Sequence, residues 1–370
     1  MATTKALKML ILGLTGQCNF ACSYCYAHQH PQEGMSFATA VQAIDLAAES
    51  GRPFVLQFSG GEPLIAFDCL QEIAGYVHRK RIPAIMQVQT NASLLDRTKA
   101  AYLREAKIGV GISLDGRPDQ NDVLRRLPSG EGTSHLILRG AEALASAGVQ
   151  TGITCVVAAS NVGHLAGIVE MAYYLGNVKK IGFDLLRAQG RGAGVKAAGA
   201  QELREVLEQV LATANRLGQQ TGRKLVFSHT ERVESLAGKG LPGFAHCHAM
   251  NGEAAFADAS GELYACASLS GIPEFRLGNI KEGIDPYKQQ VIGAAIRESM
   301  AFCPPCPYFA LCGGGCFARW YGAGSSGKPY LPECILKQVF IEEYQQRLKN
   351  MTEISKGKRE CVQACSHLLS

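Results

Sequence analysis

Several features that would place this chain in a specialised class of protein are missing from its sequence. Its one apolar run near the start, residues 9–14, is too short for a signal-peptide core or a membrane span, and no small-residue cleavage site follows it. No Lys/Arg block marks a nucleic-acid surface, although the net charge is +5. No repeat of about 20–50 residues stands out. We therefore expect a cytoplasmic protein that neither crosses a membrane nor binds nucleic acid.

The composition indicates a globular chain with an unusual stock of thiols. The 370 residues are 47% hydrophobic and 19% charged, and the chain is long enough for one large domain plus a smaller one. Fourteen cysteines are present without an export signal. Disulfide frameworks belong to oxidising compartments, so these cysteines indicate metal or cluster ligands in a reducing, anoxic cytoplasm.

The most informative cysteines are Cys18, Cys22 and Cys25, which have C-x3-C-x2-C spacing directly after the apolar run. Three thiolates can hold three irons of a [4Fe–4S] cube, and the sequence has no closely spaced fourth cysteine to close it. A cube with an open iron can bind and reduce a small molecule. A structural zinc knuckle is the alternative, but zinc sites use four closed ligands in paired C-x2-C halves.

Strand-like and helix-like segments alternate through the first half of the chain. Short apolar runs predict strands at residues 10–14, 54–58, 84–88, 108–114, 152–157 and 180–186. Helical spacing of apolar residues predicts helices at residues 37–49, 67–78, 94–105, 134–147, 164–175, 201–218 and 335–348. This alternation predicts an α/β fold whose parallel sheet curls into a partial (β/α)6, TIM-like barrel. Functional loops then follow the carboxyl ends of the strands.

Polar motifs follow these predicted strands in order. Two adjacent glycines after the second strand let the backbone approach a ligand closely, and the planar fork of an arginine suits a carboxylate. Arg126 and Arg139 are competitors for that last role. The candidate residues are Gly60, Gly61, Glu62 and Pro63 after the second strand, Asn91 after the third, Ser113 and Asp115 at the end of the fourth, and Arg125 beyond it.

With Tyr24 between its second and third cysteines, the first motif resembles the C-x3-C-x-aromatic-C signature of the radical S-adenosylmethionine (SAM) superfamily. The resemblance implies that SAM chelates the open iron and is cleaved to methionine and a 5′-deoxyadenosyl radical, which abstracts hydrogen from a substrate. It also implies the cofactor contacts. These are Tyr24 and Tyr26 beside the cofactor, Gly60, Gly61, Glu62 and Pro63 at the SAM amino group, Asn91 at the ribose, Ser113 and Asp115 near the carboxylate and ribose, and Arg125 at a carboxylate. The family usually has glycine where this chain has Ala92.

Seven more cysteines lie between residues 247 and 334, at intervals that resemble the SPASM extension of radical SAM maturases. That extension holds two auxiliary [4Fe–4S] clusters, so the resemblance implies three clusters in all. The ligand pattern of that extension, applied to this chain, implies that the distal cluster is bound by Cys303, Cys306, Cys312 and Cys334. It implies that the proximal cluster is bound by Cys247, Cys266 and Cys316.

The proximal set is one cysteine short of a closed cube. It therefore has an open iron or a ligand other than cysteine, for which the flanking His246 and His248 are candidates. The remaining cysteines have plainer interpretations. Cys69 and Cys155 are expected to be buried inert thiols, and Cys361 and Cys365 to lie in an exposed polar tail without a site, with a metal site or thiol pair as the alternative.

The resemblance divides the chain into a radical SAM partial barrel (1–190), a connecting helical segment (191–244), a SPASM domain (245–350) and a polar, frayed tail (351–370). It predicts an enzyme that abstracts hydrogen from a ribosomally made precursor peptide and forms a crosslink or another side-chain or backbone modification. A flavodoxin or ferredoxin would supply electrons. Cys18 leaves little room before it for a leader-binding domain, so we expect a separate leader-recognition protein.

Three alternatives stay open at this stage. An anaerobic sulfatase maturase, which makes formylglycine, fits the length, but Ala267 stands where those enzymes carry a catalytic aspartate. A radical SAM enzyme of haem or other cofactor biosynthesis is the second. A non-catalytic iron–sulfur electron carrier is the third, and it would have no use for the motif at residues 60–63.

Overall fold

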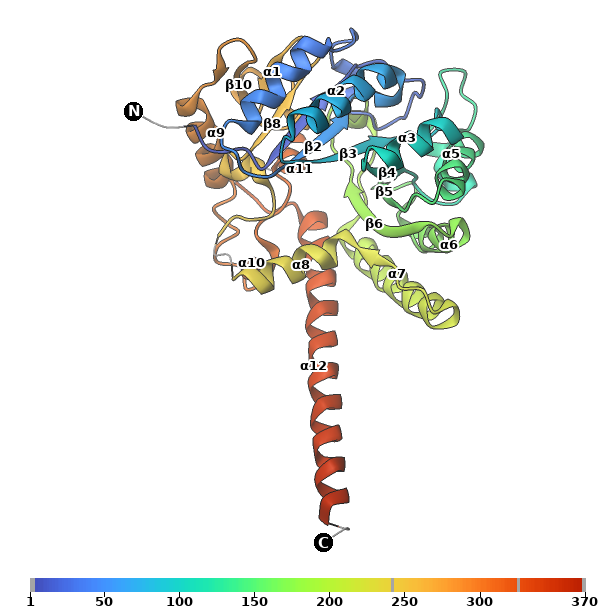
Figure 1. Cartoon of the computed structure of the whole chain (residues 1–370). Coiled ribbons are helices and arrows are strands. Elements are labelled where there is room, and N and C mark those ends of the chain that lie inside the picture. Colours follow the sequence, from blue (N-terminus) through green and yellow to red (C-terminus); the bar gives the residue numbers. More distant parts are fainter. Residues whose placement is uncertain (1–3, 241–242, 325–326, 368–370) are drawn as a thin grey trace.

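Six parallel strands stand in chain order in the middle of an 11-stranded sheet. The computed structural model describes residues 4–240, 243–324 and 327–367, and for residues 239 and 352–367 only the backbone. Each of the six strands pairs in parallel with the next (Figure 1). They are β1 (Met9–Gly13), β2 (Phe54–Ser59), β3 (Ala84–Thr90), β4 (Gly109–Ser113), β5 (Thr151–Val157) and β6 (Val178–Leu185). All six predicted strands are confirmed, and so is the α/β class.

The predicted connecting helices are also present. They are α1 (Phe37–Ala48), α2 (Phe67–Lys80), α3 (Arg97–Glu105), α5 (Ser134–Ser146), α6 (Ala166–Leu175) and α7 (Ala200–Thr221). α3 begins later than predicted because the Asp96 carboxylate accepts the backbone N–H of Lys99 at 2.7 Å and so caps the helix. The short α4 (Pro118–Leu124) was not predicted.

The sheet stays open rather than closing β6 onto β1. The second neighbour of β1 is β8 (Ala254–Ala257), in parallel, and the outer neighbour of β6 is the two-residue β7 (Val226–Phe227). Beyond β8 the sheet continues antiparallel through β9 (Glu262–Tyr264), β10 (Arg276–Asn279) and β11 (Gly283–Ile284). None of β7 to β11 was predicted. One sheet thus spans the predicted barrel and the region after residue 245, and the domain boundaries remain a prediction.

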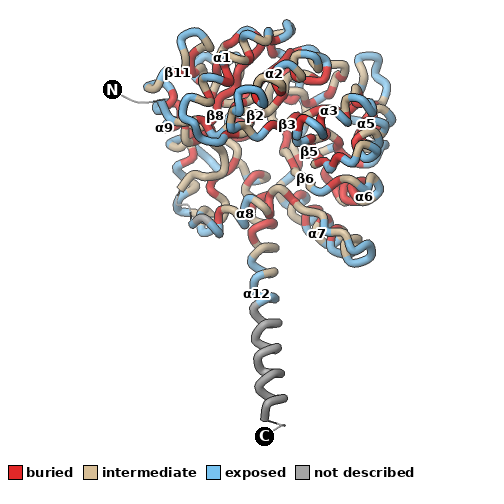
Figure 2. Tube along the Cα trace, in the orientation of Figure 1, coloured by how far each residue is buried: buried red, intermediate tan, exposed pale blue. Residues whose placement is uncertain are grey.

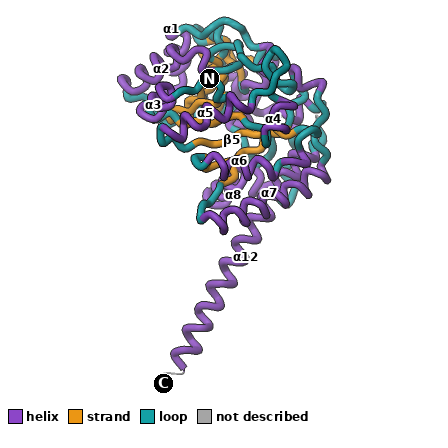
Figure 3. Tube along the Cα trace, turned by 90° about the vertical axis from the view of Figure 1, so that its right-hand side faces the viewer, coloured by secondary structure: helices purple, strands orange, loops and turns teal. Residues whose placement is uncertain are grey.

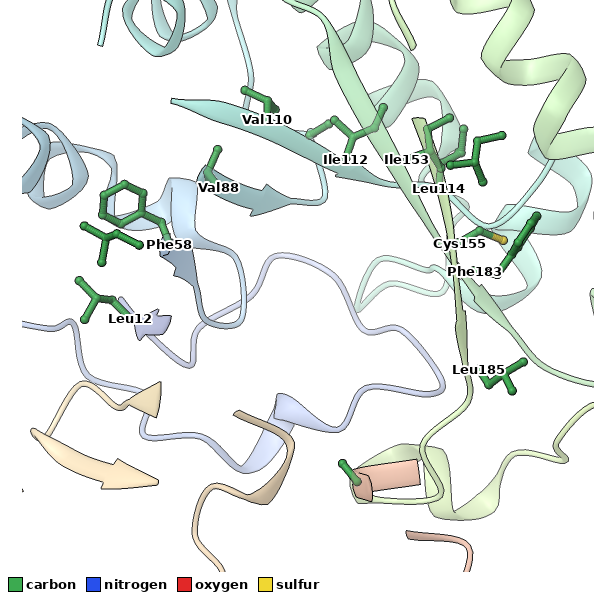
Figure 4. Close-up of a cluster of buried hydrophobic side chains, with 14 of the residues drawn as sticks. Leu12, Phe58, Val88, Val110, Ile112, Leu114, Ile153, Cys155, Phe183 and Leu185 are labelled. Carbon is green, nitrogen blue, oxygen red and sulfur yellow. The ribbon is translucent and has the colours of Figure 1, made fainter. Parts of the chain in front are cut away.

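The core lies between the helices and one face of the parallel strands. Figure 3, viewed from the side of α5 and α6, shows these helices in front of the strands. Alternate strand residues are buried and form the cluster in Figure 4. Examples, one from each of β1 to β6, are Leu12, Phe58, Val88, Ile112, Ile153 and Phe183. The intervening residues are half-buried and partly polar, and Gln57, Gln89 and Thr154 line a cavity of about 360 Å³.

The remaining helices belong to the second half of the chain. They are α8 (Ser228–Lys239), α9 (Pro286–Ser299), α10 (Phe309–Cys312), α11 (Phe317–Gly322) and α12 (Leu331–His367). The first turns of α12 are the buried ones, and the helix then leaves the body of the molecule (Figure 2). The prediction of a frayed tail from residue 351 is wrong, because α12 continues to His367. The side chains of Cys361 and Cys365 lie outside the described residues. Within the described ranges, no helix carries an apolar stretch long enough to cross a bilayer.

Candidate functional site

The loop after β1 brings the first three cysteines together as free thiols. Burial is the main cause that raises the pKa of Cys18 to about 12, and the nearby Cys22 and Cys25 add to it. Burial likewise raises the pKa of Cys22 to about 11. Such thiols stay protonated unless a metal takes the place of the protons. The triad therefore fits the three-thiolate side of a [4Fe–4S] cluster.

The two glycines after β2 allow the turn there to lie directly against the cysteine loop. The Gly61 N–H donates to the Thr15 carbonyl at 2.7 Å, and the Glu62 N–H donates to the Gln17 carbonyl at 2.8 Å. A Cβ atom on Gly61 would meet the Gln17 carbonyl oxygen at 2.3 Å, well inside contact distance. The sequence suggested that these glycines admit a ligand; the structure shows that they admit the backbone leading to Cys18.

Glu62 fastens the end of β2 to the end of β3. Its side chain is 1% exposed, and its carboxylate accepts hydrogen bonds from the Thr90 hydroxyl at 2.6 Å and the Asn91 N–H at 2.7 Å. It also caps the short helix Pro63–Ala66, with Pro63 at its first position. Burial raises the pKa of Glu62 to about 7, although these hydrogen bonds favour the charged form. Glu62 thus holds together the loops after β2 and β3, which lie around the three cysteines.

Asn91 reaches from the end of β3 to the cysteine loop. Its amide nitrogen donates to the Asn19 side-chain oxygen at 2.9 Å and lies 4.0 Å from the Cys18 sulfur. The next residue, Ala92, has φ +65° and is fully buried. That left-handed backbone explains why glycine suits this position better than alanine. A Cβ on Gly140 of α5 would strike the Ala92 carbonyl oxygen at 1.9 Å, which fixes Gly140 as glycine.

A buried ion pair locks the middle of the cysteine loop. Asp115 accepts from the Arg125 Nε at 2.8 Å and Nη2 at 3.2 Å, and from the Tyr24 hydroxyl at 2.5 Å. The guanidinium of Arg125 also lies 5.4 Å from the centre of the Tyr24 ring. The predicted residues Tyr24, Asp115 and Arg125 therefore bond to one another. The competitors Arg126 and Arg139 are exposed.

The side chains of Ser113 and Tyr26 have partners other than Asp115. The Ser113 hydroxyl accepts from the Gln89 amide at 3.0 Å, within the polar face of the sheet. Tyr26 is capped by Arg187, whose guanidinium lies 5.2 Å from the ring centre. Arg187 pairs with Asp184 at 2.6 Å. Neither Arg187 nor Asp184 was predicted as a site residue. Both lie at the carboxyl end of β6, where functional residues of such a sheet are expected.

Four of the C-terminal cysteines line a single cavity of about 90 Å³. Burial and then the three partner thiols raise the pKa of Cys303 to about 12. Trp320 lines the same cavity, and its buried indole N–H has no hydrogen-bond partner among the described groups. Four free thiols around one space fit a closed [4Fe–4S] cluster. The four are Cys303, Cys306, Cys312 and Cys334, the set predicted for the distal cluster.

The other three C-terminal cysteines form a second group. Burial and then Cys266 and Cys316 raise the pKa of Cys247 to about 12. The candidate ligands His246 and His248 have partners other than these thiols among the described residues: the His246 Nε2 lies 3.4 Å from the Lys337 ammonium, and the His248 Nδ1 lies 3.7 Å from Glu253. For the fourth position of this set, an open iron or a ligand other than cysteine remains a prediction.

Across the described part of the chain, no three Cys, His, Asp or Glu side chains meet closely enough to hold one metal ion. A cubane core separates its ligands more widely than a single ion does, which suits the three thiol groups.

The two cysteines predicted to be buried inert thiols differ in their surroundings. Cys155 is fully buried, whereas Cys69 is half-buried and donates to the Met35 carbonyl at 3.4 Å.

Comparison with known proteins supports the same family assignment. The family model described as the Radical SAM superfamily matches residues 12–172. The uncharacterized protein MJ0907 of Methanocaldococcus jannaschii is 32% identical over 278 residues, which cover 75% of this chain and 90% of that protein. A cysteine-type anaerobic sulfatase-maturating enzyme of Clostridium perfringens is 25% identical over 343 residues, covering 84% of this chain and 88% of that enzyme.

A solved structure shows the same fold. The structure described as native anSMEcpe with bound AdoMet and Cp18Cys peptide superposes with a TM-score of 0.78 at 22% identity, covering 94% of this chain and 99% of that one. The superposition extends through the region after residue 245, because the covered share exceeds the first half of the chain.

Proposed function

Because this chain belongs to the radical SAM superfamily, and is related to sulfatase-maturating enzymes, we propose that it modifies a ribosomally made precursor peptide. Cys18, Cys22 and Cys25 would hold the SAM-binding [4Fe–4S] cluster. When bound, the cluster and SAM supply a 5′-deoxyadenosyl radical by one-electron cleavage of the sulfonium. The expected product carries a crosslink or another side-chain or backbone change.

The observation that carries this proposal is the grouping of the cysteines into three separate sets of free thiols. The first set lies beside the turn at residues 60–63, the predicted SAM contact. The other two would hold auxiliary clusters, which can accept an electron from a substrate radical. An electron carrier would need no turn of this kind.

The chain's own residues have two kinds of role in this proposal. Tyr26, Asn91, Ser113 and the backbone of Gly60 and Gly61 remain the proposed SAM contacts. Arg125 and Asp115 bond one another, and Asp115 also accepts the hydroxyl of Tyr24 in the cysteine loop. The pair would therefore support these contacts by holding that loop in place. Glu62 does the same through the β3 loop.

Sulfatase maturation is the second candidate. It is favoured by the relative from Clostridium perfringens, which is matched over most of its length. Against it stands Ala267, since the residue after Cys266 has no carboxylate here. A catalytic base would have to come from elsewhere.

The experiment has two stages. Anoxically reconstituted, dithionite-reduced protein is first incubated with SAM, and 5′-deoxyadenosine is measured. The chain is then co-expressed with each small open reading frame near its gene, and the peptides are weighed by mass spectrometry. A mass change supports peptide maturation, while formylglycine in a sulfatase peptide supports the second candidate. Absence of 5′-deoxyadenosine from cluster-loaded protein overturns both.

The proposal includes two protein partners. Each cleavage of SAM consumes one electron, which a flavodoxin or ferredoxin would supply. A separate protein would present the leader of the peptide, and affinity purification with the encoded neighbours tests this. Tight leader binding by the isolated chain contradicts the separate presenter.

A further inference from the structure

A chain of five ionic side chains, three of them buried and two partly buried, lies between β6 and α12. We call Arg187, Asp184, Arg319, Glu333 and Lys337 the charge chain. Arg187 pairs with Asp184 at 2.6 Å, and Asp184 also pairs with Arg319. Arg319 pairs in turn with Glu333, whose carboxylate lies 3.7 Å from the Lys337 ammonium. The side chains of Arg319, Glu333 and Lys337 are 8%, 0% and 9% exposed.

The charge chain borders both C-terminal groups of cysteines and reaches the residue that follows Cys25. At one end, Arg187 caps the ring of Tyr26, which directly follows Cys25. Toward the other end, the Glu333 carboxylate accepts the backbone N–H of Cys316 at 3.1 Å. Glu333 precedes Cys334 in sequence and lines the four-cysteine cavity together with Lys337. Glu333 therefore stands in the wall between the two C-terminal thiol groups.

Stability alone gives a poor reason for this arrangement. Buried ion pairs commonly stabilise a fold less than apolar side chains of the same size, because the charges lose their hydration. Two N–H groups of the charge chain, the Nε atoms of Arg187 and Arg319, are also buried without a partner among the described atoms. Unpaired buried donors suit a site that takes up an electron-rich group.

We infer that the charge of Glu333, held in place by Arg319 and Lys337, sets the reduction potentials of the two C-terminal clusters. This inference rests on the proposed function, which places those clusters there. Reduction adds one electron to a cluster, so a nearby carboxylate disfavours the reduced state and a nearby ammonium favours it. Little water screens these charges, so their effect at short range is large. Glu333 is thus a positioning residue that acts on the clusters through charge.

The test is a redox titration of the holoprotein followed by electron paramagnetic resonance. Dithionite supplies one electron to each cluster under anoxic conditions. Glu333→Gln keeps the size and the acceptor oxygen but removes the charge, so the potentials of the C-terminal clusters should shift upward. Lys337→Gln should shift them downward, and Lys337→Arg should restore the wild-type values. Glu208→Gln removes the same charge from an exposed site on α7 and should leave every potential unchanged.

The outcomes separate this inference from the function on which it rests. Wild-type protein whose iron content accounts only for the first cluster contradicts the proposed function. Loaded Glu333→Gln protein with wild-type potentials overturns the inference, and so do shifts of one sign in both variants, which indicate general loosening. If Glu333→Gln fails to fold or load, Lys337→Gln decides alone: a downward shift supports the inference and an unchanged potential refutes it.

Discussion

Replacing Arg125 by glutamine should destabilise the protein severely, because Arg125 neutralises a carboxylate with no access to water. The side chains of Arg125 and Asp115 are 7% and 0% exposed, and two hydrogen bonds join them. Removing one partner of a buried pair costs about 3–5 kcal/mol. Glutamine can retain one hydrogen bond, so we expect a loss of roughly 3 kcal/mol, a large part of the stability of a typical domain.

Arg117 offers a matched control, because it also pairs with a carboxylate. It pairs with Glu170, but the two side chains are 58% and 35% exposed. Exposed pairs contribute about 0–1 kcal/mol, so Arg117→Gln should have little effect. Chemical denaturation of the anoxic apoprotein, followed by circular dichroism, measures both variants. The double variant with Asp115→Asn should lose less than the sum of its single changes, because no charge is left unpaired. Equal effects of Arg125→Gln and Arg117→Gln would refute the reasoning.

Three other changes test separate parts of the site. Ala92→Gly should raise the free energy of unfolding by roughly 1 kcal/mol, since φ +65° strains alanine; a destabilised variant would contradict this. The folded-state pKa of Glu62, raised from 4.5 to about 7, means that wild-type stability falls as pH rises from about 4.5 through 7. Denaturation of the apoprotein should show a fall of roughly 3 kcal/mol, absent from Glu62→Gln, and parallel pH profiles would argue against it. Cys25→Ala should abolish SAM cleavage, whereas Cys306→Ala should keep part of it while blocking product; equal loss in folded protein would show that the cysteine groups do not divide the work.

The sequence predicted the parts of the fold that carry long, regular signals. The strands β1 to β6 are apolar runs between turn residues, and their order follows from βα alternation. By contrast, β8 to β11 are only two to four residues long and could not be distinguished from loop. Strands of that length are defined by their pairing partners, which lie far away in sequence, as for Met9 with Ala254.

The thiol groups were predictable, but the groups that support them were not. Cysteine spacing and resemblance indicated the sets that the structure brings together. Asp184 and Arg319 are 135 residues apart, and no local pattern links them. The sequence predicted that another group approaches Gly61 closely, but it suggested a ligand. The group is the Gln17 carbonyl, and its position depends on the tertiary fold.

The central claim is that the first three cysteines hold an iron–sulfur cluster that cleaves SAM. The direct measurement is the yield of 5′-deoxyadenosine from anoxic, cluster-loaded and dithionite-reduced protein incubated with SAM. The account predicts 5′-deoxyadenosine from the wild type and none from Cys18→Ala. Loaded wild-type protein that forms none, or a Cys18→Ala variant that forms as much as wild type, would contradict it.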